Sequence, residues 1–254
     1  EERPQQWLWW PYLLHNAVSM VDGDPGVGKG LFTIQLAANI SQGWPLPDQQ
    51  GEPVLPVGAP QHVLFVACED NLSTTVKHRL RNAGADQTKI HVLEGYLGTE
   101  DELRPFTFQH MAVLDQALTD QPCALVVIDP IQAYLGDVDM HRANEVRPLT
   151  NALRQLAEKH QCCIICIRHP AKPGQGAHKA IHRGMGSQDF MGLARTGLFL
   201  EDHPADKTKA IVFQIKSNVG IHGRPQIFSK QDGKFEWCGV SRIPQHLLLG
   251  EGYV

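Results

Sequence analysis

The sequence predicts an α/β fold in which a mostly parallel, twisted sheet is flanked by helices and extended by antiparallel strands near the C-terminus. Three observations support this prediction. Short apolar runs rich in β-branched residues alternate with segments of helical periodicity. Several of these runs are apolar almost throughout, as expected for strands covered on both faces of a parallel sheet. After residue 196 the helical pattern fades, and the remaining runs are typical of antiparallel strands.

The elements follow in order along the chain. The expected strands cover residues 17–22, 62–67, 124–129, 162–167, 196–201, 210–216 and 234–239. The expected helices cover residues 29–41, 72–83, 108–119 and about 142–160. Pro148 interrupts the apolar stripe of the last helix, so this helix should bend or begin late. The 254 residues suffice for one large domain, with residues 1–16 as an N-terminal arm and residues 240–254 as a C-terminal tail.

Composition narrows the class of protein. Apolar residues make up 42% and charged residues 20%, which is ordinary globular usage and excludes a disordered chain. No apolar run is long enough to span a bilayer, and the first residues lack the pattern of a secretory signal. Three of the six cysteines, Cys162, Cys163 and Cys166, lie in one apolar run, and no second pair has zinc-site spacing. We interpret them as core residues in a reducing compartment and expect a cytoplasmic protein with no membrane association.

The charged residues are unevenly distributed. Residues 1–140 hold 7 Lys and Arg against 18 Asp and Glu, whereas residues 141–254 hold 16 against 9. A basic second half suggests a polyanionic partner approached by one face. Attraction between the faces of neighbouring subunits is the alternative explanation.

The strongest functional motif is a glycine-rich loop at residues 23–30. It follows an apolar strand, opens a helix and has the G-x-x-x-x-G-K pattern of a Walker A phosphate loop. Glycines let backbone N–H groups curl around phosphate oxygens, while the helix N-terminus and the Lys29 ammonium add positive charge. The candidate nucleotide-binding residues are Gly23, Asp24, Pro25, Gly26, Val27, Gly28, Lys29, Gly30 and Leu31.

Position 30 departs from the Walker A pattern. A Ser or Thr normally follows the lysine and binds Mg²⁺ through its hydroxyl, but this chain has Gly30. We expect nucleotide binding to persist, with slow hydrolysis or with the ion held through an extra water. A dinucleotide site is disfavoured, because Leu31 stands where that pattern needs glycine.

Two later strand ends supply acidic residues. The run 124–129 ends in Asp129, which is the Walker B pattern and predicts a carboxylate beside the phosphates and Mg²⁺. The run 62–67 leads into Glu69 and Asp70, and a carboxylate there suits a general base for the attacking water. We favour Glu69 as the base and Asp70 as a helix cap or supporting partner. Capping of the following helix is the alternative role for this acidic pair.

Together these motifs resemble the RepA-like branch of the RecA-type ATPases. The resemblance rests on residues 7–12, 23–29, 67–70, 128–130 with 134–136, 168–169, 183–187, 192–195 and 216–218, which follow in the same order. The family includes hexameric replicative helicases of plasmids and ATPases of phages and mobile elements. The resemblance therefore implies a RecA-like ATPase domain, ATP and Mg²⁺ as ligands, and a homo-oligomeric ring that is expected to be a hexamer.

The resemblance also implies roles for single residues. Lys29 would hold the β- and γ-phosphates, Asp129 would lie at the magnesium region, and Glu69 would activate water. His169 would sense the γ-phosphate, unless it is only a hydrogen-bonded residue at a strand end.

Two basic residues are implied to act on a neighbouring subunit. Arg195 would be an arginine finger on the nucleotide of that subunit, helped by Lys216. An ordinary salt bridge is the alternative for Arg195.

A basic stretch at residues 168–187 bears on DNA binding. Lys172, Lys179 and Arg183 are candidate contacts to single-stranded DNA, because the corresponding loops of RecA-type rings line the central pore. The stretch lacks aromatic residues for base stacking. A solvated loop is an equally serious interpretation.

The sequence thus predicts an ATP-hydrolysing RecA-like motor, a ring-shaped helicase or translocase. It would act on single-stranded DNA in plasmid, phage or mobile-element replication, alongside replication partners. One alternative is a nucleotide-gated DNA-binding or scaffold protein with weak hydrolysis, because of Gly30. Another is a RadA- or KaiC-like regulatory ATPase.

Overall fold

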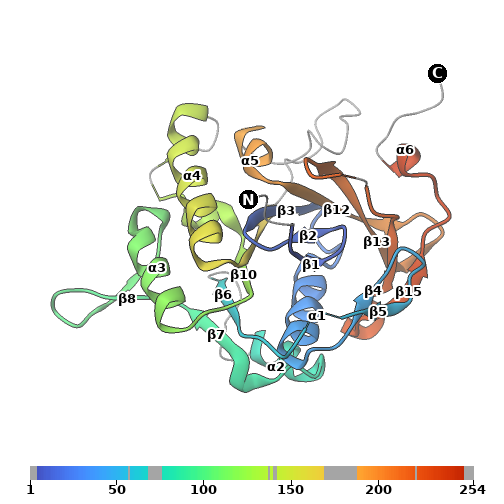
Figure 1. The fold of residues 1–254 in the computed structure, drawn as a ribbon, viewed down its shortest axis with the longest axis horizontal. Coiled ribbons are helices and arrows are strands. Elements are labelled where there is room, and N and C mark those ends of the chain that lie inside the picture. Colours follow the sequence, from blue (N-terminus) through green and yellow to red (C-terminus); the bar gives the residue numbers. More distant parts are fainter. Residues whose placement is uncertain are drawn as a thin grey trace.

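A nine-stranded sheet lies at the centre of the molecule (Figure 1). The computed structural model describes residues 5–56, 58–67, 76–136, 138–139, 142–168, 188–220 and 222–248. The strand order is β15-β14-β13-β12-β3-β11-β10-β6-β7. Many neighbouring strands are far apart in sequence, as expected when crossover connections join parallel strands.

The sheet has a parallel part and an antiparallel part. The parallel strands are β3 (Ala17–Gly23), β6 (Val63–Ala67), β7 (Ile90–Leu93), β10 (Leu125–Asp129), β11 (Cys163–Arg168) and β12 (Thr196–His203). The antiparallel strands are β13 (Asp206–Ser217), β14 (Gln226–Ser229) and β15 (Glu236–Val240). The predicted parallel sheet with an antiparallel extension is therefore confirmed, with β7 as an additional edge strand.

Helices cover both faces of the sheet (Figure 1). The apolar residues of α1 (Lys29–Gln42) and α2 (Lys77–Asn82) join one core cluster. Those of α3 (Met111–Asp120), α4 (Ala143–His160) and α5 (Gln188–Leu193) join a second cluster on the other face.

Strand β11 shows why a central strand is apolar throughout. Cys163, Ile165 and Ile167 belong to the first cluster, whereas Ile164 and Cys166 belong to the second. Alternate residues of a strand point to opposite faces, so both sets need to be apolar. Burial raises the pKa of the Cys166 thiol to about 12, which fits the predicted role of these cysteines in the core.

The four expected helices are present, with ends that differ from the expected bounds. Of the helix expected at 72–83, residues 77–82 form α2, and residues 72–75 lie outside the described part of the chain. The helix expected at 142–160 begins at Ala143 and continues through Pro148, so the late start does not occur. Val146, which precedes the proline, is fully buried, and this contact holds the first turns on the sheet. The helix expected at 108–119 begins with the 3₁₀ turn η3 (Phe108–His110), which leads into α3.

The N-terminal arm packs on the first face. Its strands β1 (Trp7–Trp9) and β2 (Leu13–Leu14) pair antiparallel. The buried Trp9 ring lies 6.2 Å from the Phe32 ring of α1 and 5.5 Å from the Trp237 ring of β15. The arm therefore ties α1 to the C-terminal strands.

The remaining elements are short. They comprise β4 (Leu46–Pro47) with β5 (Pro53–Leu55), β8 (Gly95–Leu97) with β9 (Leu103–Pro105), α6 (Gln245–Leu248), and the 3₁₀ turns η2 (Gln87–Lys89), η4 (Ile131–Tyr134) and η6 (Gln231–Gly233). The β8–β9 hairpin projects from the left of the molecule in Figure 1. Helix α6 lies within the segment expected to be a C-terminal tail.

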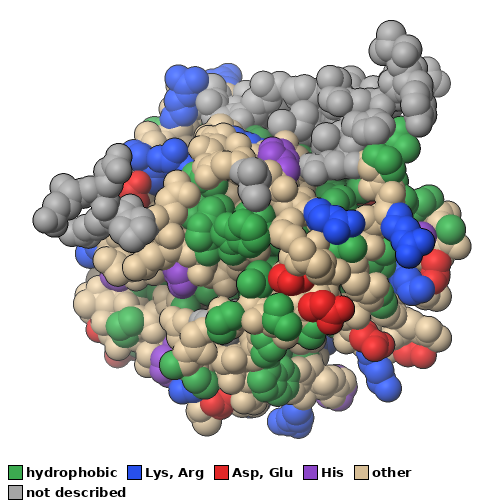
Figure 2. All heavy atoms as spheres, turned by 45° about the vertical axis from the view of Figure 1, so that its right-hand side comes forward, with side chains coloured by type: hydrophobic (Ala, Val, Ile, Leu, Met, Phe, Trp, Pro, Cys, Tyr) green, Lys and Arg blue, Asp and Glu red, His purple; other side chains and the backbone are tan. Residues whose placement is uncertain are grey.

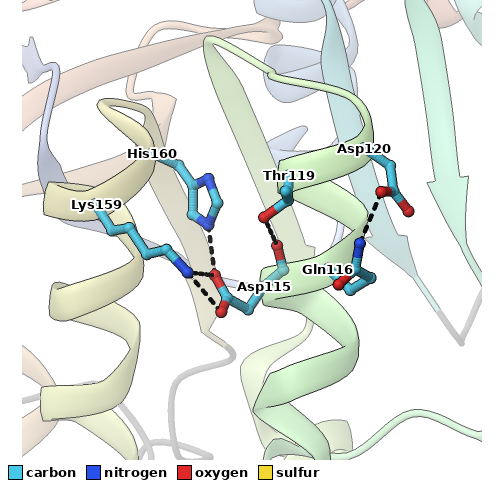
Figure 3. Close-up of polar contacts among 6 residues, drawn as sticks. All are labelled: Asp115, Gln116, Thr119, Asp120, Lys159 and His160. Carbon is cyan, nitrogen blue, oxygen red and sulfur yellow. Dashed lines mark hydrogen bonds and ion pairs between the residues drawn. The ribbon is translucent and has the colours of Figure 1, made fainter.

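Charged side chains join α3 to α4 (Figure 3). Lys159 Nζ donates to the two carboxylate oxygens of Asp115 at 2.6 and 2.7 Å. His160 Nε2 lies 2.6 Å from Asp115 Oδ1. The hydrogen bonds from Lys159 and then from His160 lower the pKa of the Asp115 carboxyl.

The surface in Figure 2 is mixed in charge. Lys and Arg side chains on this face are interspersed with Asp and Glu among the described residues. Within the parts of the chain that the structure describes, no helix has the length and apolar character needed to cross a bilayer.

Candidate functional site

The glycine-rich loop connects the end of β3 to the start of α1. Gly26 has φ 79° and Gly28, the residue before α1, has φ 105°. Both values lie in a region that side chains rarely adopt, so glycine is required for this turn. A Cβ added to Gly28 would also lie 3.4 Å from the Phe228 ring. The predicted binding residues 23–31 therefore form one tight turn and the first residues of a helix, whose leading N–H groups have no partners within the helix.

The Lys29 ammonium lies inside this turn. Nζ donates to the Gly23 carbonyl at 2.6 Å and to the Asp24 carbonyl at 3.1 Å. Only 6% of Lys29 is exposed, so the positive charge is held at the loop rather than in bulk water. The role of Lys29 as a ligand for phosphate oxygens stays a prediction from the Walker A pattern.

Gly30 leaves an open position where a hydroxyl is usual. Among the described residues, a Cβ added to Gly30 would meet no atom within 4 Å outside its own helix and chain neighbours. The nearby Thr33 hydroxyl donates to the Gly30 carbonyl at 3.1 Å, so it serves the helix backbone. Position 30 therefore offers no hydroxyl for direct Mg²⁺ ligation.

A second lysine, distant in sequence, forms a hydrogen bond with the loop. Lys230 Nζ donates to the Gly26 carbonyl at 3.2 Å and to Asp202 Oδ1 at 2.6 Å. Lys230 follows β14, which reaches the loop only because β12, β13 and β14 pair side by side. No local sequence signal marks this residue, since 204 positions separate the two partners.

The Walker B aspartate lies at the same edge of the sheet as the loop. Asp129 ends β10, and β11 lies between β10 and β3. All three strands are parallel, so their carboxyl ends meet at one edge. Asp129 pairs in register with Ala67 at the end of β6, directly before the segment that contains Glu69.

A buried ion pair joins β3 to the neighbouring strand β11 at this edge of the sheet. Arg168 Nε and Nη2 donate to the two carboxylate oxygens of Asp22 at 2.9 and 2.6 Å. The two side chains are 2% and 0% exposed. Arg168, grouped above with the basic stretch 168–187, is therefore part of β11 and is not on the surface. Removing one partner of such a pair costs about 3–5 kcal/mol, because the other charge is left buried and alone.

Asp22 directly precedes the phosphate loop. It is the register partner of Arg168, so the pair fixes the end of β3 to the end of β11. This pair was not predicted, because neither residue belongs to the Walker A pattern. The sequence shows an Asp before the loop and an Arg at a strand end. The two residues can be paired only once β3 and β11 are known to be neighbouring strands.

Arg195 and Lys216 lie away from the loop of the same chain. The Arg195 N–H donates to the Val18 carbonyl, and Gly23 lies five residues further along β3, about 16 Å away at 3.3 Å per residue. Lys216 Nζ donates to the carbonyl of Gly192 at 3.2 Å and to that of Met191. Burial and then the Arg195 charge lower the pKa of the Lys216 ammonium. The structure thus groups these two residues with each other and not with Lys29.

Several predicted residues lie outside the described part of the chain. They are Glu69, Asp70, His169, Lys172, Lys179 and Arg183. Within the described part, no group of three or more His, Cys, Asp or Glu side chains is arranged to hold a metal ion.

Comparison with known proteins decides the family. The model of an AAA domain family matches residues 1–175, which is more than half of the chain. The chain belongs to this family. The matched region contains the phosphate loop, Asp129 and the Asp22–Arg168 pair, whereas α5 and β12–β15 lie beyond it.

Curated relatives support a RecA-type P-loop ATPase. The chain is 24% identical over 235 residues to the DNA repair protein RadA of Bacillus subtilis (strain 168), covering 91% of this chain and 43% of that protein. It is 26% identical over 165 residues to the DNA repair protein RadA of Mycobacterium tuberculosis (strain ATCC 25618 / H37Rv), covering 64% of this chain and 28% of that protein. The chain spans less than half the length of these relatives.

Proposed function

We propose that this chain binds ATP with Mg²⁺ and hydrolyses it in a homo-oligomeric ring, a hexamer, that moves on single-stranded DNA. The carrying observation is the Lys29 ammonium, held inside a glycine turn at the edge of the sheet where Asp129 also lies. The helicase or translocase role in plasmid, phage or mobile-element replication rests on the resemblance to the RepA-like branch.

The residues divide the work of hydrolysis. Lys29 and the N–H groups of residues 26–30 bind the phosphates, and the Asp129 carboxylate lies where it can hold Mg²⁺ or a water bound to it. Bound Mg²⁺ would neutralise charge on the β- and γ-phosphate oxygens. Glu69 accepts the proton of the attacking water as its oxygen bonds to the γ-phosphorus and the bond to the β–γ bridging oxygen breaks. Arg195 of a neighbouring copy, helped by Lys216, stabilises the negative charge that develops on the β–γ bridging oxygen. His169 senses whether the γ-phosphate is present.

The position of Arg195 supports action between copies. Its backbone lies about 16 Å along β3 from Gly23, too far for the side chain to lie at the phosphates of its own loop. The proposed DNA contacts are Lys172, Lys179 and Arg183, whose flexible side chains suit contacts to phosphates without base specificity.

Two further functions are favoured by specific observations. Similarity to RadA over 91% of the chain favours a regulatory or repair ATPase. Gly30 favours a nucleotide-gated DNA-binding or scaffold protein that hydrolyses slowly. ATP turnover with and without single-stranded DNA separates the three functions. Stimulation by DNA supports the motor, indifference supports the regulator, and binding without turnover supports the gated scaffold.

Replacement of the loop lysine tests the site itself. Lys29→Ala removes charge-assisted contacts worth roughly 1.5–3 kcal/mol each, so ATP affinity should fall about tenfold to a hundredfold. Binding is measured by titration calorimetry. Lys77→Ala, at the exposed start of α2, is the matched control and should bind ATP normally. Unchanged affinity in Lys29→Ala would exclude the proposed site.

A further inference from the structure

A polar cavity of about 430 Å³ lies between α4, α5 and the neighbouring ends of β12 and β13. Its polar lining residues are Arg147, Thr150, Asn151, Arg154, Arg195 and Asn218. Among the described residues that line it, three are arginines and none is acidic. A cavity that gathers three guanidinium groups has the chemistry of an anion site.

One wall of the cavity is a single face of α4. Arg147, Asn151 and Arg154 are spaced by four and three residues, which places them on the same side of the helix. Seven residues at 1.5 Å per residue put the two arginines about 10 Å apart along the axis. This spacing suits a row of linked anions better than a single ion.

The opposite wall is tied together by the backbone. The Asn218 N–H donates to the Arg195 carbonyl at 2.9 Å, so the start of β12 and the end of β13 hold the two side chains beside each other. Lys216 lies next to this wall and is close enough to Arg195 for the two charges to repel. The wall is therefore basic and fixed in position.

The Arg154 guanidinium has an acidic neighbour on the same helix. Glu158 Oε1 lies 3.6 Å from Arg154 Nη1, and the two side chains are 51% and 43% exposed. An ion pair this long and this exposed is worth little and is easily exchanged for a better ligand.

We propose that this cavity is a second phosphate-binding site, separate from the phosphate loop of its own chain, which takes the linked phosphate groups of a nucleotide or of single-stranded nucleic acid. The arginine forks bind pairs of phosphate oxygens, and the asparagine amides donate to the oxygens between them. The site does not require hydrolysis at the phosphate loop, so the failure of one proposal is separable from the failure of the other.

The test uses two probes on a background of Lys29→Ala, which weakens the phosphate loop. Inorganic tripolyphosphate is titrated by calorimetry, and a labelled oligothymidylate is titrated by fluorescence anisotropy at several salt concentrations. The cavity variant is Arg147→Gln with Arg154→Gln. The matched control is Arg81→Gln with Arg104→Gln, which removes two exposed charges from α2 and from the β8–β9 hairpin.

If the ligand is a nucleotide, the cavity variant should bind tripolyphosphate about tenfold more weakly. If the ligand is nucleic acid, the slope of log K against log salt concentration for the oligonucleotide should fall in magnitude by about 1.4, because each lost single-strand phosphate contact contributes about 0.7. Loss with tripolyphosphate alone assigns the site to a nucleotide, and loss with the oligonucleotide assigns it to nucleic acid. Asn151→Asp, which adds an acid at an exposed position, should weaken the same probe. The proposal is overturned if both probes bind the cavity variant within twofold of the background, or if the control loses as much.

Discussion

Gly30 is the residue at which the phosphate loop differs most clearly from its usual pattern. No atom of the residues that the structure describes, apart from its own helix and chain neighbours, lies within 4 Å of an added Cβ, and Gly30 is not among the glycines with positive φ. A serine would therefore fit without strain and would restore the hydroxyl that normally binds Mg²⁺.

We expect Gly30→Ser to raise ATP turnover by roughly tenfold, which corresponds to about 1.4 kcal/mol of the barrier. Gly30→Ala is the matched control, because it adds a Cβ and favours the helix but brings no hydroxyl. Steady-state phosphate release measures both variants. Equal stimulation by alanine and serine, or none by serine, would contradict a role for the missing hydroxyl.

Local patterns predict some site residues and not others. Gly26, Gly28 and Lys29 are predictable because the turn they form depends on adjacent residues and their backbone geometry. Arg168 and Lys230 are not, because Asp22 and Gly26 become their neighbours only after strands distant in sequence have paired. Sequence alone fixes neither the strand order nor the partner of a buried charge.

At the scale of elements, Asp115 links two helices that cover the second face of the sheet. It accepts from Lys159 and lies within hydrogen-bonding distance of His160, both on the last turn of α4. Its pKa is lowered in the folded protein. A lowered folded-state pKa contributes stability above the unfolded-state value, about 3.9, and this contribution is lost as pH falls through the folded-state pKa.

Asp115→Asn should therefore lower the free energy of unfolding near neutral pH by roughly 0.2–1 kcal/mol, the range of partly exposed pairs. The difference from the parent should vanish at acidic pH, below the folded-state pKa. Urea unfolding at several pH values measures it. Asp120→Asn is the control on the same helix, since Asp120 accepts from Gln116 of its own helix in Figure 3 and has no contact with α4 drawn there.

The sequence fails to predict a helix or strand mainly where tertiary contacts determine whether that element forms. The strands 17–22 and 124–129 are recognisable because they are apolar on both faces and buried against two helical layers. Strand β7 is only partly buried at the sheet edge, so its sequence lacks that signature. The helix through Pro148 persists because Val146 and Leu153 are buried on either side of the proline.

For the whole molecule, the central question is whether copies act on each other. Arg195 is exposed and lies about 16 Å along β3 from its own phosphate loop. An arginine finger supplied by another copy contributes about 10³-fold or more to turnover.

Arg195→Ala protein mixed with wild-type protein should therefore inhibit ATPase activity more than simple dilution does, because each variant copy disables a neighbouring site. Arg242→Ala, which removes another exposed arginine, is the matched control and should only dilute. Particle size with a non-hydrolysable ATP analogue confirms that mixed assemblies form. A linear decline with the fraction of Arg195→Ala would argue against action between copies.

The contacts of Lys230 and Phe228 with the phosphate loop have a practical consequence for truncated versions of the protein. A protein trimmed to the family match, ending at residue 175, would retain the loop, Asp129 and Arg168 but lose β12, β13, β14 and β15. Strand β3 would become an outer strand with unsatisfied hydrogen-bonding groups, a common starting point for aggregation. The smallest fragment worth expressing for nucleotide studies therefore extends through Val240, well past the end of the family match at residue 175.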